Sequence, residues 1–182
     1  MVGTLDWVPA LERPDLLAPA VEKALRAGDV DADAVAVAEI DPSLADTAAF
    51  CERYQVGLDA SANCVVIAAK RAGRRDLAAC VVLATTRADV NGLVRRHLEA
   101  RKASFAPMDT AVSETGMEYG GITPIGLPAG WPLLVDAAVA AADRVVLGSG
   151  VRRSKLLAPG RLVAALPGAE VLEGLGRPVG EA

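Results

Sequence analysis

Residues 116–132 read GMEYGGITPIGLPAGWP and contain five glycines and three prolines. Neither the interior of a helix nor that of a strand tolerates this density, because glycine is too flexible and proline lacks an N–H donor. The segment is therefore predicted to be a long loop. Long loops in compact domains are either functional or disordered, and the apolar residues of this one disfavour disorder. We therefore expect it to form part of a binding site.

The Gly120-Gly121 pair at the centre of this loop suits contact with a ligand. Adjacent glycines let the backbone approach a ligand with no Cβ in the way, and they expose N–H groups as donors. Pro124 fixes the turn that follows, and Thr123 adds a hydroxyl. Such a surface fits a ribose, a carbonyl or a phosphate, although a Gly-Gly pair by itself more often serves only a turn.

Regular elements are predicted on both sides of the loop. Before it, apolar spacing and capping residues indicate a helix over 15–27, a strand over 33–40, a helix from Asp41-Pro42 to about residue 55, and a hairpin with strands at 64–69 and 77–84. Helices capped by Asp89 and Asp109 follow. After the loop, strands are expected at 133–135, 145–147 and 151–157, with an Ala-rich stretch at 137–142 and a helix near Pro159. The order indicates a mixed α/β (α+β) domain with a largely antiparallel sheet, because the hairpin connection is too short for a parallel crossover.

The bulk composition is that of one domain. The chain has 182 residues, of which 52% are hydrophobic and only 3% aromatic. This length buries a core without metal or disulfide staples, and no apolar run is long enough to span a membrane. We expect an N-terminal extension over 1–14, a single domain over 15–172 and a flexible tail over 173–182. The start lacks a signal-peptide pattern, which predicts a cytoplasmic protein.

Metal and nucleic-acid signals are weak in the sequence. Cys51, Cys64 and Cys80 show no paired spacing and His97 is the only histidine, so neither zinc nor a disulfide nor another cofactor is predicted. A net charge of −4 argues against a general nucleic-acid coat but permits one nucleic-acid end to dock on a local basic patch. The candidates for such a patch, which also read as a solvated face, are the hairpin arginines with Arg95, Arg96, Arg101 and Lys102.

Motifs on both sides of the loop resemble one family in order and spacing. They are Thr115-Gly116-Met117, the Gly120 to Gly126 segment, Leu133-Leu134-Val135-Asp136, and the segments 148–153 and 157–162. Together they resemble the YbaK/EbsC family, the domain associated with prolyl-tRNA synthetases, over residues 15–172. The resemblance implies a curved, mainly antiparallel or barrel-like sheet flanked by helices. It also implies an aminoacyl-tRNA deacylase, which hydrolyses the ester that links a wrong amino acid to the 3′-terminal adenosine of a tRNA.

The resemblance further implies where the substrate is held. The partner would be a tRNA acceptor end that carries an amino acid; whether a synthetase also binds, and the oligomeric state, stay open. No metal is implied. The residues expected to bind the substrate are Gly120, Gly121, Ile122, Thr123, Pro124, Gly126, Ser149, Gly150, Arg152 and Ser154.

The sequence departs from the family at a lysine that its best-known members carry at the start of the first hairpin strand. That position falls on Cys64, or on Asn63 if the register slips by one, and these two are the candidate catalytic residues. Asn63 offers only a neutral hydrogen bond, and Cys64 would need a lowered pKa to act as a nucleophile. Lys70 lies six residues further along the strand, roughly 20 Å away at about 3.3 Å per residue, and is not assigned the role.

Three readings of the function therefore remain. The first is a deacylase that works mainly by positioning and backbone dipoles, the second is a non-catalytic binding module of the same fold, and the third is a hydrolase with Cys64 as nucleophile. The cations Arg152, Arg153 and Lys155 follow a Gly-Ser-Gly turn that would suit an anion. Ser154 replaces an acidic residue frequent in the deacylase subfamily, so substrate choice is expected to differ. His97 is expected to be structural, with a role as general base as the alternative.

Overall fold

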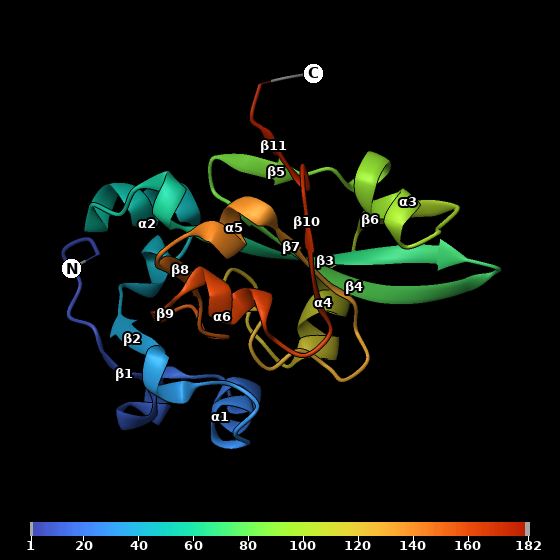
Figure 1. Cartoon of the computed structure of the whole chain (residues 1–182). Coiled ribbons are helices and arrows are strands. Elements are labelled where there is room, and N and C mark those ends of the chain that lie inside the picture. Colours follow the sequence, from blue (N-terminus) through green and yellow to red (C-terminus); the bar gives the residue numbers. More distant parts are fainter. Residues whose placement is uncertain (1, 181–182) are drawn as a thin grey trace.

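The computed structural model describes residues 2–180 as a mixed α/β fold with three sheets (Figure 1). The first sheet is antiparallel, in the order β1-β2-β9-β8: Val8–Pro9, Ala36–Glu39, Ser154–Ala158 and Val145–Gly148. The second has the order β10-β7-β4-β3-β6: Ala169–Leu172, Leu133–Asp136, Arg74–Leu83, Ala62–Arg71 and Lys102–Phe105. The third pairs β11, Gly176–Pro178, with β5, Thr86–Ala88.

Short helices surround these sheets. The α-helices are α1 Pro19–Arg26, α2 Thr47–Tyr54, α3 Arg95–His97, α4 Met108–Thr115, α5 Ala137–Ala141 and α6 Gly160–Ala164. A π-helical turn, Val90–Val94, leads into α3. Turns of 3-10 helix cover Ala10–Glu12, Pro14–Leu16, Ala32–Ala34, Pro42–Leu44 and Leu58–Ala60.

Several boundaries follow directly from local sequence. The Asp89 carboxylate accepts hydrogen bonds from the backbone N–H groups of Gly92 (3.1 Å) and Leu93 (3.0 Å), as the capping pattern predicts. Gly116 ends α4 with φ +67°. The β3–β4 hairpin turns at Ala72 and Gly73, whose φ values of +47° and +80° match the twist that a two-residue hairpin turn requires.

The main core lies between the first and second sheets. Val37 and Leu156 from the first sheet meet Val81 and Val135 from the second, and Val21 of α1 closes the cluster. The outer face of the first sheet packs on α2, where the Phe50 ring is fully buried. The outer face of the second sheet packs on the π-helical turn and α3. This packing brings β8 of the first sheet into contact with β3 of the second, and a β-bridge joins Ser61, just before β3, to Val146 on β8.

The fold class is confirmed, with differences in detail. The described strands pair mainly antiparallel, but β10–β7 and β4–β7 are parallel, and the strands form separate open sheets rather than one barrel. The first helix begins at Pro19 rather than at residue 15, because Pro14 starts its own 3-10 turn. Strand β9, expected over 151–157, begins only at Ser154. It follows a turn in which the Ser149 hydroxyl hydrogen-bonds to the carbonyls of Val151 and Ser154.

Both ends of the described chain pack on the fold. Leu5 and Ala10 are buried, and β1 pairs with β2 within the stretch expected as an extension. Near the other end, Leu175 is fully buried and β11 pairs with β5, so residues 173–180 differ from the flexible tail that the Gly- and Pro-rich sequence predicted. Residues 181–182 lie outside the described residues. Within residues 2–180, no helix combines the length and apolar character needed to cross a bilayer.

Candidate functional site

A cavity of about 350 Å³ lies beside the first half of β3, where β6 no longer pairs with that strand. Four segments form most of its wall: the start of β3, the loop before α2 with the first residue of that helix, the centre of the Gly-rich loop, and the facing ends of β8 and β9. Phe105, Ala106 and Ala111, from the end of β6 and from α4, complete it. The polar members among its lining residues are Asp46, Thr47, Asn63, Tyr119 and Lys155, and Cys64, Gly120, Ile122 and Gly148 lie beside them.

Lys155 on β9 places a buried amine in this wall. Its cross-strand neighbours Gly148 and Ala38 are small, which leaves room for the long side chain. The residue is only 8% exposed, its Nζ donates to the carbonyl of Ala45 at 2.9 Å, and Nζ lies 5.1 Å from the centre of the Phe50 ring. Burial lowers the pKa of the Lys155 amine to about 8, since the charged form loses hydration. The amine is therefore mainly protonated at neutral pH and loses its proton not far above it.

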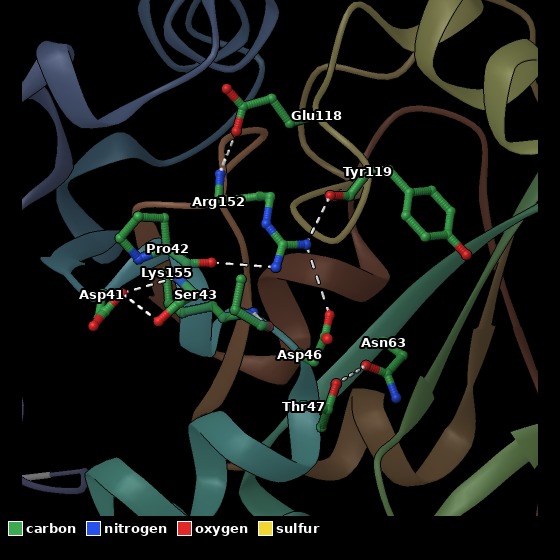
Figure 2. A network of polar contacts seen from close by, with 11 residues as sticks. Asp41, Pro42, Ser43, Asp46, Thr47, Asn63, Glu118, Tyr119, Arg152 and Lys155 are labelled. Carbon is green, nitrogen blue, oxygen red and sulfur yellow. Dashed lines mark hydrogen bonds and ion pairs between the residues drawn. The ribbon is translucent and has the colours of Figure 1, made fainter.

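Asn63 lies across the cavity on β3. The Thr47 hydroxyl donates to the Asn63 Oδ1 atom at 2.7 Å, which fixes the orientation of the amide (Figure 2). The Asn63 amide nitrogen has no hydrogen-bond acceptor within residues 2–180. An uncharged donor is thus present at the edge of the cavity.

Cys64, the neighbour of Asn63, is half-buried and lines the same cavity. Burial, with a smaller contribution from Cys80, raises the pKa of the Cys64 thiol far above its ordinary value. A thiol in that state is protonated at neutral pH and a poor nucleophile. The surroundings of Cys64 therefore favour its role as a small packing residue.

Arg152 links three segments around the cavity: the β8–β9 turn that carries it, the Gly-rich loop and the segment before α2 (Figure 2). Its guanidinium donates to the carbonyls of Tyr119 and Pro42, both at 3.2 Å, and lies 3.7 Å from the Asp46 carboxylate. Its backbone N–H donates to the Glu118 carboxylate at 2.7 Å. A Cβ built on Gly120 would clash with the Arg152 guanidinium, so a side chain at residue 120 would displace the arginine.

The Gly-rich loop rests on the turn between β8 and β9. The Gly121 carbonyl accepts from the Gly150 N–H at 2.7 Å, and the Gly150 carbonyl accepts from the Glu118 N–H at 2.9 Å. A Cβ on Gly121 would lie 2.7 Å from the Val151 carbonyl oxygen, which explains the glycine. The Gly121 N–H donates to the Glu118 carbonyl, whereas the N–H groups of Gly120 and Ile122 have no acceptor in the described chain. Gly120 and Ile122 line the cavity, which makes these two N–H groups candidate donors to a ligand.

Six other residues expected to bind substrate do not line this cavity. Ser149 and Ser154 are buried and hydrogen-bonded to each other at 2.6 Å, and Gly150 packs against Ala18. The Thr123 side chain is fully buried, and its hydroxyl oxygen is a buried polar atom without a partner in the described chain. Pro124 and Gly126 line a second cavity of about 780 Å³ beside α1. None of these six is among the residues that line the first cavity, and their part in substrate binding stays a prediction.

The remaining candidates lie far from the cavity. Lys70 is exposed at the far end of β3, and the His97 Nε2 atom lies 2.9 Å from a carboxylate oxygen of Glu170. Among the described residues, no cluster of three or more metal-ligating side chains is present. The sequence indicates for Lys155 only a place in a cationic turn, because it does not reveal that small residues on β2 and β8 let the amine reach the cavity. Its one sequence signal is a lone charge inside the apolar run of β9.

Comparison with solved structures identifies the same fold in other proteins. A "putative trans-editing enzyme for prolyl tRNA synthetase" superposes with a TM-score of 0.72 at 20% identity, over 86% of this chain and 94% of that protein. A hypothetical protein gives a TM-score of 0.74 at 18% identity, over 87% and 99% of the two chains. A comparison with curated protein sequences finds no match.

The family follows from the sequence model that the chain matches. Residues 41–164, which hold all four segments of the first cavity, match the model of the aminoacyl-tRNA editing domain. The protein therefore belongs to the aminoacyl-tRNA editing domain family, and the resemblance inferred from the Gly-rich loop is confirmed.

Proposed function

We propose that this protein hydrolyses the ester between an amino acid and the 3′-terminal adenosine of a mischarged tRNA, acting in trans. The observation that carries the proposal is the buried amine of Lys155 in the wall of the cavity. It supplies, from β9, the positive charge that Asn63 and Cys64 do not supply on β3. Family membership and the fold neighbours support the tRNA acceptor end as the partner.

The chemistry follows from where charge develops during ester hydrolysis. Water adds to the ester carbonyl carbon and gives up a proton, and the carbonyl oxygen becomes an oxyanion. The carbon–oxygen bond to the ribose then breaks as the ribose oxygen takes up that proton through solvent. The Lys155 ammonium and the open N–H groups of Gly120 and Ile122 would stabilise the oxyanion. The Asn63 amide would hold the attacking water or the ribose.

The state of Lys155 sets the expected pH dependence. Its pKa of about 8 leaves the ammonium dominant at neutral pH and removes it above that value. Deacylation, after subtraction of uncatalysed ester hydrolysis, is therefore expected to fall as the pH rises through about 8. A rate that instead rises through this range would assign Lys155 the role of a base.

The test is deacylation of a panel of mischarged tRNAs by the wild type and by Lys155→Met. Methionine matches the length of the lysine stem but carries no charge. We expect the variant to lose about 10²- to 10³-fold in kcat, as when one donor to an oxyanion is removed. Lys23→Met, which removes an exposed lysine on α1, is the matched control and should retain the wild-type kcat.

Two outcomes would overturn the proposal. No turnover of any mischarged tRNA by the wild type, together with binding of the aminoacyl end, would identify the non-catalytic binding module instead. Turnover that survives in Lys155→Met but is lost in Cys64→Ala would return the chemistry to the β3 thiol.

A further inference from the structure

A row of three cations crosses the far end of the second sheet. Lys70 on β3 lies directly opposite Arg75 on β4 and directly opposite Lys102 on β6. Residues that face each other in neighbouring strands point to the same face of the sheet, so the three charges stand side by side. All three side chains are exposed, and the hairpin that carries two of them projects beyond the body of the molecule (Figure 1).

The cation row is not neutralised by nearby carboxylates. The acidic residues at this end are engaged by other arginines: Glu99 pairs with Arg71 at 2.6 Å and Asp76 pairs with Arg74 at 2.9 Å. None of the three cations in the row forms an ion pair within residues 2–180. Like charges directly opposite one another in a sheet are destabilising. Three of them in a chain of net charge −4 therefore indicate an anionic partner.

The cation row and the cavity share the strand β3. Cys64 and Val66 in the cavity wall have the same side-chain parity as Lys70, while the opposite face packs on the π-helical turn and α3. Six residues separate Cys64 from Lys70, which is roughly 20 Å at about 3.3 Å per residue. A stacked nucleic-acid strand advances about 3.4 Å per nucleotide, so this span corresponds to about six nucleotides.

That span is longer than the unpaired CCA end of a tRNA. If the terminal adenosine occupies the cavity, the row lies just beyond the unpaired end, beside the first base pairs of the double-stranded acceptor stem. We propose that Lys70, Arg75 and Lys102 form a docking surface for the phosphate backbone of the acceptor stem, near this junction. The inference rests on the proposed function for the place of the 3′ end, and it assigns the exposed hairpin to affinity rather than to chemistry.

The test compares two RNA probes. One is an uncharged acceptor-stem minihelix that ends in CCA, and the other is the single-stranded CCA trinucleotide alone. Binding is measured by fluorescence anisotropy over a salt series, with the wild type and the triple variant Lys70→Gln/Arg75→Gln/Lys102→Gln. The matched control, Arg26→Gln/Arg144→Gln/Arg161→Gln, removes the same number of exposed charges elsewhere.

We expect the row variant to bind the minihelix about tenfold or more weakly at 0.1 M salt, with a salt slope reduced by about two to three, because three phosphate contacts are lost. Binding of the trinucleotide should stay within about twofold, and the control variant should match the wild type with both probes. Equal weakening by the two triple variants, or unchanged minihelix binding by the row variant, would overturn the docking surface.

Hydrolysis separates this inference from the proposed function. Wild-type protein that binds the minihelix through the row but never deacylates a mischarged tRNA would overturn the proposed function and leave the docking surface in place. A row variant with unchanged kcat/KM on full-length mischarged tRNA would overturn the docking surface and leave the proposed function in place.

Discussion

The cavity and the hairpin end hold lysines in opposite physical states. Lys155 is buried, has a lowered pKa and makes one hydrogen bond, whereas Lys70 is exposed beside two other cations. A buried charge costs folding free energy but acts strongly on a nearby developing charge, because the local dielectric is low. An exposed charge costs little and acts weakly, so several are needed. The two proposals accordingly assign chemistry to the buried lysine and affinity to the exposed cations.

The largest expected effect on stability concerns the pKa of Lys155. Its folded-state pKa of about 8 lies below the ordinary 10.5, so burying the amine destabilises the protein fully below pH 8, and this cost is lost as pH rises toward 10.5. The shift corresponds to about 3 kcal/mol. Lys155→Met should therefore be more stable than the wild type at pH 7, with the difference shrinking by about 2–3 kcal/mol at pH 10.

Urea unfolding of both proteins at the two pH values measures this difference. Lys70→Met, the exposed counterpart, should stay within about 0.5 kcal/mol of the wild type at either pH. A similar pH trend for both lysines would remove the contrast between the two regions.

A smaller effect on stability is expected when one glycine in each region is replaced by alanine. Gly121→Ala places a Cβ 2.7 Å from the Val151 carbonyl oxygen, so the Gly-rich loop must move away from the β8–β9 turn. We expect a loss of about 2–3 kcal/mol in stability and a higher KM.

Gly73→Ala in the hairpin turn meets no atom within 4 Å, and it carries only the strain of φ +80°. Its expected cost is about 1 kcal/mol, with no change in kcat on a short aminoacylated substrate. Equal costs for the two substitutions in thermal unfolding would contradict the close backbone contact.

The smallest effect concerns Thr123. Its buried hydroxyl has no partner in the described chain, so Thr123→Val removes an unsatisfied polar atom without changing the side-chain shape. We expect the variant to gain about 1 kcal/mol in a chemical denaturation measurement. Thr86→Val near the hairpin base is the control, and it should lose stability because the Thr86 hydroxyl donates to the Leu83 carbonyl at 2.9 Å.

Local chemistry predicted much of the fold but only part of the site. The apolar runs of β3 and β4 and the caps at Asp89 and Gly116 act within a few residues, and the hairpin and these two helix boundaries appear as expected. The strand Gly176–Pro178 could not be expected, because its glycine and proline favour a loop and its pairing with β5 is set by the burial of Leu175.

Local sequence likewise predicted only part of the cavity, because its walls come from segments far apart in the chain. The glycines of the 116–132 loop indicate that backbones approach closely, but they do not say whether the neighbour is a ligand or the protein itself. At Gly121 and Gly126 the neighbour is protein, the Val151 and Ala20 backbones, whereas Gly120 and Ile122 face the cavity. The position of Lys155 depends on the β8–β9–β2 register, which joins segments more than a hundred residues apart.

The contact between Gly120 and Arg152 has a consequence for how sequences of this fold can diverge. The guanidinium occupies the space that a side chain at residue 120 would fill, and it joins the loop before α2 to the Gly-rich loop. The two positions are therefore expected to covary among relatives. A relative with a larger residue in place of Gly120 should carry a shorter, uncharged residue in place of Arg152. Such pairs in a sequence alignment would mark lineages in which the loop before α2 and the Gly-rich loop are held together differently.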